Sequence, residues 1–576
     1  MFQVYNTWLK GVNEAERAEL EALAGNEKEI AERFSRELDF GTAGMRGEVG
    51  LGTYRMNVYT VRRATAGLAL YICSLGEDAK ARGVVISYDT RRFSKEFSLA
   101  AAEVLSYYGV KGYLFEGVRP VPMCSYAVRY YKAAAGIMIT ASHNPKEYNG
   151  YKVYGEDGAQ MAPEATAEVV KYIKEFTDYF AVPSDKITQT DIEGKDGCSL
   201  NTFITVIGKT VDEAYYKEVL KLSLSPNLVA KYGKDIKLVY TPVHGTGYIP
   251  VTTVFERLGI NASVVEEQAL PDTEFNTVQV PNPENAATLK LGMALGDKIG
   301  ADVVLATDPD CDRLGVAVRN PQGNFVLLTG NQIGILLLDY IITGKQQLGT
   351  LSANAAIVKT IVTSTLADRL AQSKGITVFN VLTGFKYIGE KIKQWEESGE
   401  YEYLFGFEES YGSLAGTHAR DKDAVVASML FAEMLLYHEA NGGSVYGRLM
   451  QLFQEFGYYT ECNSSTEYKG LGGMEYMAGV MARQRTVSLS EIAGYKVMYT
   501  ADYLTGTIKH LDGKMEATVL PSTDAIYYGL EDGQFVCIRP SGTEPKLKIY
   551  VLVFDTDSVR SQAKATAIME SVKGML

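Results

Sequence analysis

The sequence is poor in cysteine and in long apolar runs. Its 576 residues contain six cysteines, and no two of them lie within four residues of each other. Neither a disulfide framework nor a zinc site with paired cysteines is predicted, and a reducing cytoplasm is the simplest setting. The two most apolar runs, GILLLDYII (334–342) and VVASMLFAEMLLY (425–437), each contain an acid and are too short to span a bilayer. We expect both to form buried helices.

An excess of positive charge is also missing. Lysine and arginine number 57 and aspartate and glutamate 70, which gives a net charge of −13. Nucleic acid and anionic membrane surfaces repel an acidic chain, so we expect neither as a partner. The first residues, MFQVYNTWLKGVNEAERAELEAL, lack the apolar core of a signal peptide. An anionic small molecule stays open as a ligand, because a local basic cleft can exist in an acidic protein.

Three common catalytic motifs are absent as well. The G-x-S-x-G elbow of serine hydrolases occurs nowhere in the chain. The GKT at 208–210 has Phe203 where a phosphate-binding P-loop needs glycine. The glycine-rich stretch FGTAGMRGEVG (40–50) presents Arg46 but is no dinucleotide fingerprint, because no strand and G-x-G-x-x-G precede a helix there. The chemistry must come from a different arrangement of residues.

Alternating strand-like and helical segments dominate what is present. Helical segments separate several short β-rich runs, which lie at 84–89, 136–140, 236–242, 302–308, 376–382 and 535–540. This alternation predicts α/β units with parallel or mixed sheets. Each run leads into a polar or glycine-bearing loop, and open α/β sheets bind ligands at that end of their strands. Several such loops in one chain suggest one cleft assembled between domains.

The length predicts several domains, because a single hydrophobic core does not extend over 576 residues. A loop-like stretch, DIEGKDGCSLN, and a turn, NPQGN, suggest the first two boundaries. We predict α/β domains at 1–205, 206–325 and 326–450, followed by a smaller α+β domain at 451–576.

The segment DPDCDR (308–313) carries acids at alternate positions. In an extended segment residues i and i+2 point the same way, so these acids could aim their carboxylates at one point. The three acids are Asp308, Asp310 and Asp312. Clustered carboxylates repel one another unless a cation lies among them, and their oxygens suit Mg²⁺ or Ca²⁺. An EF-hand is excluded, because Arg313 and Arg319 hold its glycine and glutamate positions. Arg313 would suit an anionic substrate near a metal; a solvated acidic turn is the alternative.

A polar loop, ITASHNPKEYNGYKVYG (139–155), places Ser142 beside His143. In an extended segment neighbouring side chains point to opposite faces, so we expect His143 to be a poor base for Ser142. A serine without an adjacent base can still carry a phosphoryl group where a metal and cations stabilise the charge. A turn residue that hydrogen-bonds the nearby backbone is the alternative.

Two further segments could bind phosphate and sugar. RPSGTEPK (539–546) combines the guanidinium of Arg539 with two hydroxyls and a glycine, which suits a phosphate cradle; a turn between strands is the alternative. GFEESYG (406–412) places Glu408 and Ser410 two residues apart, which suits a grip on vicinal hydroxyls, and Lys422 follows in ARDKD. Alone, this second pattern is more often a solvated acidic turn.

Together these segments resemble the α-D-phosphohexomutase family, which includes phosphoglucomutases and phosphomannomutases. The segments that occur in the family's order are FGTAGMRG, YDTR, TASHNP, NGYKVYG, TPVHGTG, DPDCDR, LTGFKYIG, GFEES, RDKD and RPSGTEPK. LTGFKYIGEKI and FEESYG look most like the bacterial α-phosphoglucomutase and phosphopentomutase branch. The resemblance implies three related α/β domains with mixed sheets and a C-terminal α+β domain around a central cleft.

The resemblance also implies roles for individual residues. Ser142 would be phosphorylated and would hold Mg²⁺ together with Asp308, Asp310 and Asp312. The catalytic group would be completed by Arg46, Lys152, His143 and Lys422. Some members carry a histidine where this sequence has Gly412, so the acid/base role would fall to Lys422 or Lys152. The substrate would be bound by Thr383, Gly384, Glu408, Ser410, Arg313, Arg539, Ser541, Gly542 and Thr543. Cys311 replaces the family's usual alanine and should face away from the metal.

The implied reaction interconverts α-D-glucose 1-phosphate and glucose 6-phosphate. A phosphoserine would give its phosphoryl group to the sugar phosphate, and glucose 1,6-bisphosphate would reorient in the cleft as intermediate and activator. A phosphomannomutase or phosphopentomutase is the alternative within the family, and a metal-dependent sugar phosphatase is the alternative outside it. We expect a cytoplasmic monomer or dimer whose partner is a sugar phosphate and whose last domain moves on a hinge.

Overall fold

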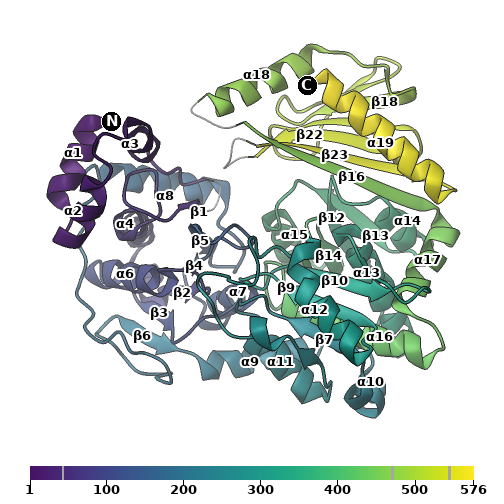
Figure 1. The fold of residues 1–576 in the computed structure, drawn as a ribbon, viewed down its shortest axis with the longest axis horizontal. Helices are drawn as coiled ribbons and strands as arrows, with labels where there is room; N and C mark the ends of the chain where they lie inside the picture. The colour runs from purple at the N-terminus through teal and green to yellow at the C-terminus, as the bar shows by residue number, and fades with distance from the viewer. Residues whose placement is uncertain (42–43, 469–471, 542–545) are drawn as a thin grey trace.

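The computed structural model describes residues 1–41, 44–468, 472–541 and 546–576. These residues form four β-sheets that follow one another along the chain, each with its own helices (Figure 1). The first three sheets are mixed, and all strand pairs of the fourth are antiparallel. The predicted fold class, three α/β units and a C-terminal α+β unit, is confirmed. The limits given above for the four domains stay a prediction.

The first sheet is covered by helices on both faces. Its strands are β1 (Gly44–Glu48), β2 (Val84–Tyr88), β3 (Gly112–Phe115), β4 (Ala135–Ile139), β5 (Tyr148–Gly155) and β6 (Ile204–Ile207), in the order β1-β5-β4-β2-β3-β6. Its helices are α4 (Val58–Ser74), α5 (Glu77–Arg82), α6 (Ser94–Tyr107), α7 (Val121–Tyr131) and α8 (Pro163–Glu175). Helices α4, α6 and α8 pack on one face and α7 on the other, so the central strands are apolar throughout.

Three short helices precede this sheet and pack as a separate aromatic cluster. They are α1 (Phe2–Gly11), α2 (Glu14–Glu21) and α3 (Glu27–Phe34). Trp8 is 1% exposed and contacts the rings of Phe34, Tyr59 and Phe180 at 5.3–5.8 Å. Burying one large aromatic side chain stabilises a fold by roughly 2–3 kcal/mol, which fastens the N-terminal helices to α4.

The second sheet repeats the mixed arrangement on a smaller scale. Its strands are β7 (Leu238–Thr241), β8 (Ser263–Val264), β9 (Val303–Thr307), β10 (Leu314–Arg319) and β11 (Phe325–Leu327), in the order β11-β10-β9-β7-β8. Its helices are α9 (Lys209–Leu220), α10 (Pro226–Tyr232), α11 (Tyr248–Leu258) and α12 (Ala286–Ile299), with 3₁₀ turns η1 (Gly233–Asp235) and η2 (Glu266–Gln268). Parallel β7 and β9 lead into antiparallel β10.

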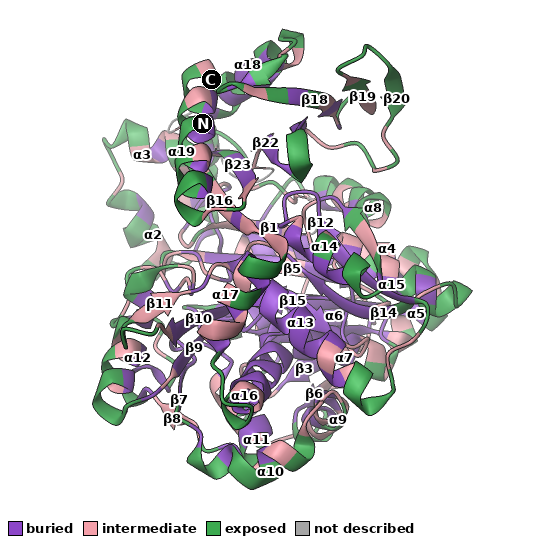
Figure 2. Ribbon diagram, turned by 90° about the vertical axis from the view of Figure 1, so that its right-hand side faces the viewer, coloured by how far each residue is buried: buried purple, intermediate pink, exposed green. Residues whose placement is uncertain are grey.

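The third sheet has the same plan again. Its strands are β12 (Ala355–Thr360), β13 (Thr377–Val381), β14 (Glu402–Phe407) and β15 (Ser413–Ala415), in the order β13-β12-β14-β15. Its helices are α13 (Gly330–Leu348), α14 (Leu366–Ser373), α15 (Lys386–Ser398), α16 (Ala424–Ala440) and α17 (Val445–Phe456). The two long apolar runs of the sequence lie in α13 and α16 and are buried over nearly all of their length, as predicted (Figure 2).

The fourth sheet is antiparallel and carries helices α18 (Gly473–Thr486) and α19 (Ser558–Met575). Its strands are β16 (Tyr458–Glu467), β17 (Glu491–Ile492), β18 (Tyr495–Asp502), β19 (Thr507–His510), β20 (Met515–Ala517), β21 (Ile526–Leu530), β22 (Phe535–Pro540) and β23 (Lys546–Asp555), with η3 (Glu531–Gly533). The order is β16-β23-β22-β21-β18-β19-β20, and β17 pairs with β18. The β19–β20 hairpin extends away from the rest of the molecule and is largely exposed (Figure 2).

Candidate functional site

Four of the predicted functional loops, one from each sheet, hold the same position. Each connects a strand to the antiparallel strand beside it: β4 to β5, β9 to β10, β14 to β15, and β22 to β23. Ser142 lies in the first loop, the three acids in the second, Glu408 and Ser410 in the third, and Ser541 in the fourth. The sequence identified these loops by the strand-like runs that precede them. It did not predict that the strand after each loop would be antiparallel.

The second loop brings its three acids together. Carboxylate oxygens of Asp308, Asp310 and Asp312 lie within 4.8 Å of one another, and all three residues are buried. The loop is a turn and not the extended segment we expected, because Cys311 has a φ of +52° and Asp308 Oδ1 accepts the backbone N–H of Asp312 at 3.0 Å. The side chain of Cys311 lies in the hydrophobic core, away from the carboxylates.

Two lysines balance part of this negative charge. Lys152 Nζ lies 2.9 Å from Asp310 Oδ2, and Lys422 Nζ lies 3.1 Å from Asp312 Oδ2. Burial opposes the charged form of Lys422, but Asp312 and the neighbouring acids outweigh it and raise its pKa. Both lysines come from other sheets than the acids, Lys152 from β5 and Lys422 from the segment before α16.

The negative charge of the three aspartates exceeds the positive charge of these two lysines. Burial and the nearby carboxylates raise the pKa of Asp308 well above its usual range. Among the described residues, Asp310 Oδ1 and Asp312 Oδ1 are buried without a hydrogen-bond partner. Buried, unpaired carboxylate oxygens that converge are the donor set that a hard divalent cation takes. The residues present therefore fit a metal ion.

Ser142 faces this cluster directly. It is 3% exposed, and its Oγ donates a hydrogen bond to Asp308 Oδ2 at 2.8 Å. The same Oγ lies 3.2 Å from His143 Nδ1, so the expectation that these neighbouring side chains point apart is wrong. The reason is the backbone: Ser142 has a φ of +51°, and alternation applies only to extended chain. Burial lowers the pKa of His143 well below its usual range, followed by the effect of Arg313 and Arg46, so the imidazole is neutral.

Sequence reasoning missed the residue that holds this loop. Arg91, 3% exposed, donates Nη2 to the carbonyl oxygens of Ser142 and Asn144 at 2.5 Å each. Its Nη1 donates to the carbonyl oxygens of Pro145 and Tyr148 at 2.8 and 3.1 Å. Asp89 pairs with its Nε at 3.3 Å. The signal was present in YDTR after β2, but nothing local shows that the arginine turns back onto a loop fifty residues away.

A polar cavity of about 870 Å³ opens beside His143. Its lining comes from the units built on all four sheets and includes nine predicted residues: Arg46, His143, Arg313, Thr383, Gly384, Glu408, Ser410, Arg539 and Ser541. The lining does not include Ser142, the three acids or the two lysines. Ser142 contacts the lining through His143. Gly542 and Thr543 fall outside the described residues.

Two groups of residues in the lining of this cavity differ in charge. Glu408 Oε1 accepts the backbone N–H of Gly384 at 2.9 Å, which joins two loops of the third sheet. Opposite them, Arg539 and Lys548 come from the hairpin strands β22 and β23, where they are near neighbours. Burial lowers the pKa of Lys548, and the positive charge of Arg539 adds to this. Sequence reasoning missed Lys548, although the alternation K-L-K in β23 places it on the same face as Lys546.

Fold and site thus define a four-unit α/β protein whose hairpin loops bring a serine and three acids together beside a cavity that several cations line. Family models for the phosphoglucomutase/phosphomannomutase α/β/α domains I, II and III match residues 37–180, 213–323 and 329–456, and the C-terminal domain model matches 496–569. The chain belongs to the phosphoglucomutase/phosphomannomutase family, as the resemblance predicted.

Curated relatives and solved structures agree with this assignment. A phosphoglucomutase from Staphylococcus saprophyticus is 36% identical over 97% of this chain and 99% of its own length. A phosphoglucomutase from Paramecium, parafusin in its open form, has the same fold with a TM-score of 0.66 at 19% identity, covering 94% of this chain and 95% of that one. A Thermus thermophilus protein described as a phosphomannomutase matches with a TM-score of 0.65 at 22% identity over 94% and 99%. Within the described residues, no helix has the length and apolar character needed to cross a bilayer.

Proposed function

We propose that this chain is a phosphoglucomutase that interconverts α-D-glucose 1-phosphate and glucose 6-phosphate. The observation that carries the proposal is the 2.8 Å contact between Ser142 Oγ and Asp308 Oδ2, at the edge of a buried three-acid cluster and beside a cavity that several cations line. The curated relatives named phosphoglucomutase support the choice of glucose. Ser142 would carry the phosphoryl group.

Ser142, Asp308, Asp310 and Asp312 would together hold Mg²⁺. A bound Mg²⁺ supplies positive charge that stabilises the oxygens of a transferring phosphoryl group. Around it, the chain's own residues position the reactants. Arg91 fixes the backbone from the carbonyl of Ser142 to that of Tyr148, and the neutral His143 leaves Oγ without a competing charge. Lys152 and Lys422 would handle protons and stabilise charge at the acceptor hydroxyl.

The second half of the cavity would bind the rest of the substrate. Glu408, Ser410, Thr383 and Gly384 would orient the sugar ring, and Arg46 and Arg313 would contact the reacting phosphate. Arg539, with Ser541, Gly542 and Thr543, would hold the phosphate that is not transferred, and Lys548 joins them. Glucose 1,6-bisphosphate would be the intermediate and would turn in the cavity between the two half-reactions. It can turn because either of its phosphates fits the cations Arg539 and Lys548, the distal cations. Cytoplasmic location and a monomeric or dimeric state stay predictions.

The test combines turnover with the mass of the protein. The wild-type chain with Mg²⁺ and a trace of glucose 1,6-bisphosphate should convert glucose 1-phosphate to glucose 6-phosphate and carry one phosphoryl group on Ser142. Ser142→Ala should lose both while keeping its unfolding temperature, and the exposed-site control Ser74→Ala should lose neither. Release of free phosphate instead would favour the sugar phosphatase, and faster turnover of mannose or ribose phosphates would favour the related mutases. Full activity of Ser142→Ala would exclude the phosphoserine mechanism.

A further inference from the structure

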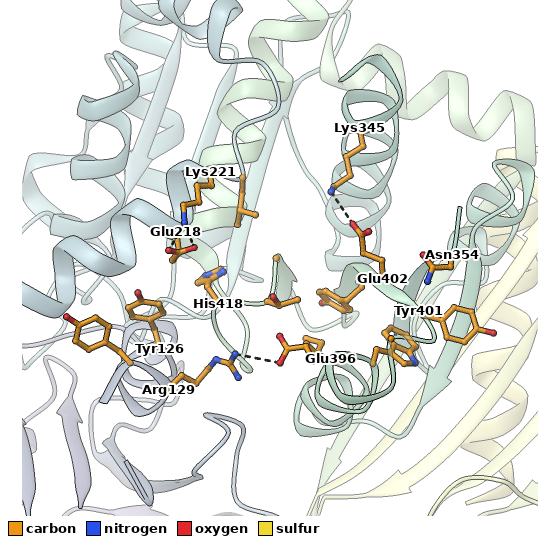
Figure 3. Close-up of a pocket in the computed structure, with 18 residues that line it drawn as sticks. Tyr126, Arg129, Glu218, Lys221, Lys345, Asn354, Glu396, Tyr401, Glu402 and His418 are labelled. Atoms are coloured by element: carbon orange, nitrogen blue, oxygen red, sulfur yellow. Dashed lines mark hydrogen bonds and ion pairs between the residues drawn. The ribbon is translucent and has the colours of Figure 1, made fainter. Parts of the chain in front are cut away.

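A second cavity, of about 840 Å³, lies on another part of the molecule (Figure 3). Its walls are formed by helix α7 of the first sheet, the end of α9, the end of α13, α15, the start of β14 and the loop after β15. Among the described residues that line it, none belongs to the site predicted from sequence. It is nearly as large as the cavity beside His143, so its lining must be explained in its own right.

The charges of this second cavity cancel. Its acidic and basic side chains, three of each sign, form three ion pairs: Lys221 with Glu218 at 2.7 Å, Arg129 with Glu396 at 3.7 Å, and Lys345 with Glu402 at 3.8 Å. Glu396 also pairs with the buried Arg420, which does not line the cavity. Because every one of these cations faces a carboxylate, the cavity is a poor site for a phosphate or another anion. The second and third separations exceed a direct hydrogen bond, and a hydroxyl that both donates and accepts can bridge such a gap.

Aromatic rings supply the rest of the lining. Tyr126 and Tyr401 are half-buried and Tyr130 is 44% exposed, so each presents ring surface to the cavity. Figure 3 places Tyr126 and Tyr401 on opposite sides of His418. Tyr401 is held from behind by Trp395, with ring centroids 5.5 Å apart. Rigid aromatic walls with a few placed polar groups are the ordinary construction of a small-molecule site.

We propose that this cavity is a binding site for an uncharged saccharide. A sugar offers hydroxyls that each donate and accept, which match the separated pairs Arg129–Glu396 and Lys345–Glu402, and C–H faces that pack on tyrosine rings. It carries no charge, which matches the cancelled charge of the lining. A sugar phosphate would bring an anion to a site where each cation is already occupied by a carboxylate.

The loop that lines this cavity continues into the catalytic cluster. Gly416, Thr417 and His418 face the cavity, and His418 Nε2 lies 2.8 Å from Asp423 Oδ2. In the sequence, Lys422 lies between His418 and Asp423, and its Nζ lies 3.1 Å from Asp312 Oδ2. A saccharide that contacts the loop from Gly416 to His418 therefore acts on the segment that leads to Lys422. The effect on turnover rests on the proposed mutase function, whereas saccharide binding does not.

Binding is tested first, on a chain that cannot turn over. Calorimetric titration of maltose into Ser142→Ala should show saturable binding that persists when glucose 1-phosphate is in excess. Tyr401→Ala and Glu402→Gln should each weaken it by about fivefold, which corresponds to roughly 1 kcal/mol of lost contact. The control Tyr107→Ala, an exposed tyrosine elsewhere, should leave the affinity unchanged. No saturable binding up to the solubility of maltose, or displacement by glucose 1-phosphate, overturns the site. Glu402→Gln alters one exposed side chain, so its result stands even if Tyr401→Ala is unstable.

Coupling is tested by activity. Saturating maltose should change the kcat of the wild-type chain about twofold or more, as a coupling of a few tenths of a kcal/mol would give. Glu402→Gln should keep the basal kcat and lose the response. Maltose binding without any change in kcat overturns the coupling and leaves the site. A chain that binds maltose but never converts glucose 1-phosphate would refute the mutase and not the saccharide site.

Discussion

Replacing Arg91 tests how the Ser142 loop is held. The substitution Arg91→Lys keeps a positive charge beside Asp89 but removes the planar fork that reaches the carbonyl oxygens of Ser142, Asn144, Pro145 and Tyr148. A lysine at this position has one nitrogen, which cannot reach both ends of the loop at once. We expect the variant to fold with a loosened loop and a displaced Ser142 hydroxyl.

The structure sets the size of the effect. Hydrogen bonds from a charged donor are worth about 1.5–3 kcal/mol each, so the loss of two of the four costs roughly 3–6 kcal/mol. Ser142 holds a left-handed φ of +51°, which opposes the native loop by about 1–2 kcal/mol once its support weakens. A displacement of the reacting oxygen by about 1 Å would lower kcat about 10²-fold. The distal cations Arg539 and Lys548 are untouched, so KM should change little.

The assay measures kcat, KM and the free energy of unfolding of Arg91→Lys beside Arg92→Lys. Arg92 is the adjacent arginine, its side chain is 54% exposed, and it forms an ion pair with Glu274 at 3.7 Å. Arg92→Lys should behave as the wild-type chain. A wild-type kcat in Arg91→Lys would refute the argument. A loss of kcat that follows only the fraction of unfolded protein would also refute it, because the loop would then have no separate role.

Three further predictions concern the metal, the lysine and pH. Mg²⁺ should raise the unfolding temperature of the wild-type chain but not of Asp310→Asn; an equal shift in both would exclude the acid cluster as the metal site. Gly412→Ala places a Cβ 2.0 Å from Lys422 Cδ, so it should displace this lysine, lower kcat and cost about 1–3 kcal/mol of stability. The control Gly574→Ala, whose Cβ meets nothing within 4 Å, should have neither effect. Burial and the adjacent carboxylate of Glu408 raise the pKa of Glu409 to about 7. The free energy of unfolding should therefore fall, by roughly 3 kcal/mol at most, as the pH rises from about 4.5 to 7. Glu409→Gln should remove this pH dependence.

Much of the fold could be read from local pattern. The strands β2, β4, β9 and β22 lie within two residues of the runs predicted from alternation, and the long apolar runs are buried helices. Side-chain periodicity and burial fix such segments through near neighbours in sequence, so no tertiary information was needed. The acid triad was found in the same way, although it converges through a turn and not through an extended strand.

The sequence by itself determined which residues could do chemistry, because a serine loop, three alternating acids and a cationic turn are local patterns. Only the tertiary structure decided how they meet. Ser142 and Asp308 are 166 residues apart and touch because equivalent hairpins of two sheets face each other. The sign of φ at Ser142, which brings His143 to its hydroxyl, depends on the distant Arg91. The second cavity depends on segments from the units of three sheets packing together, and no local pattern carries that information.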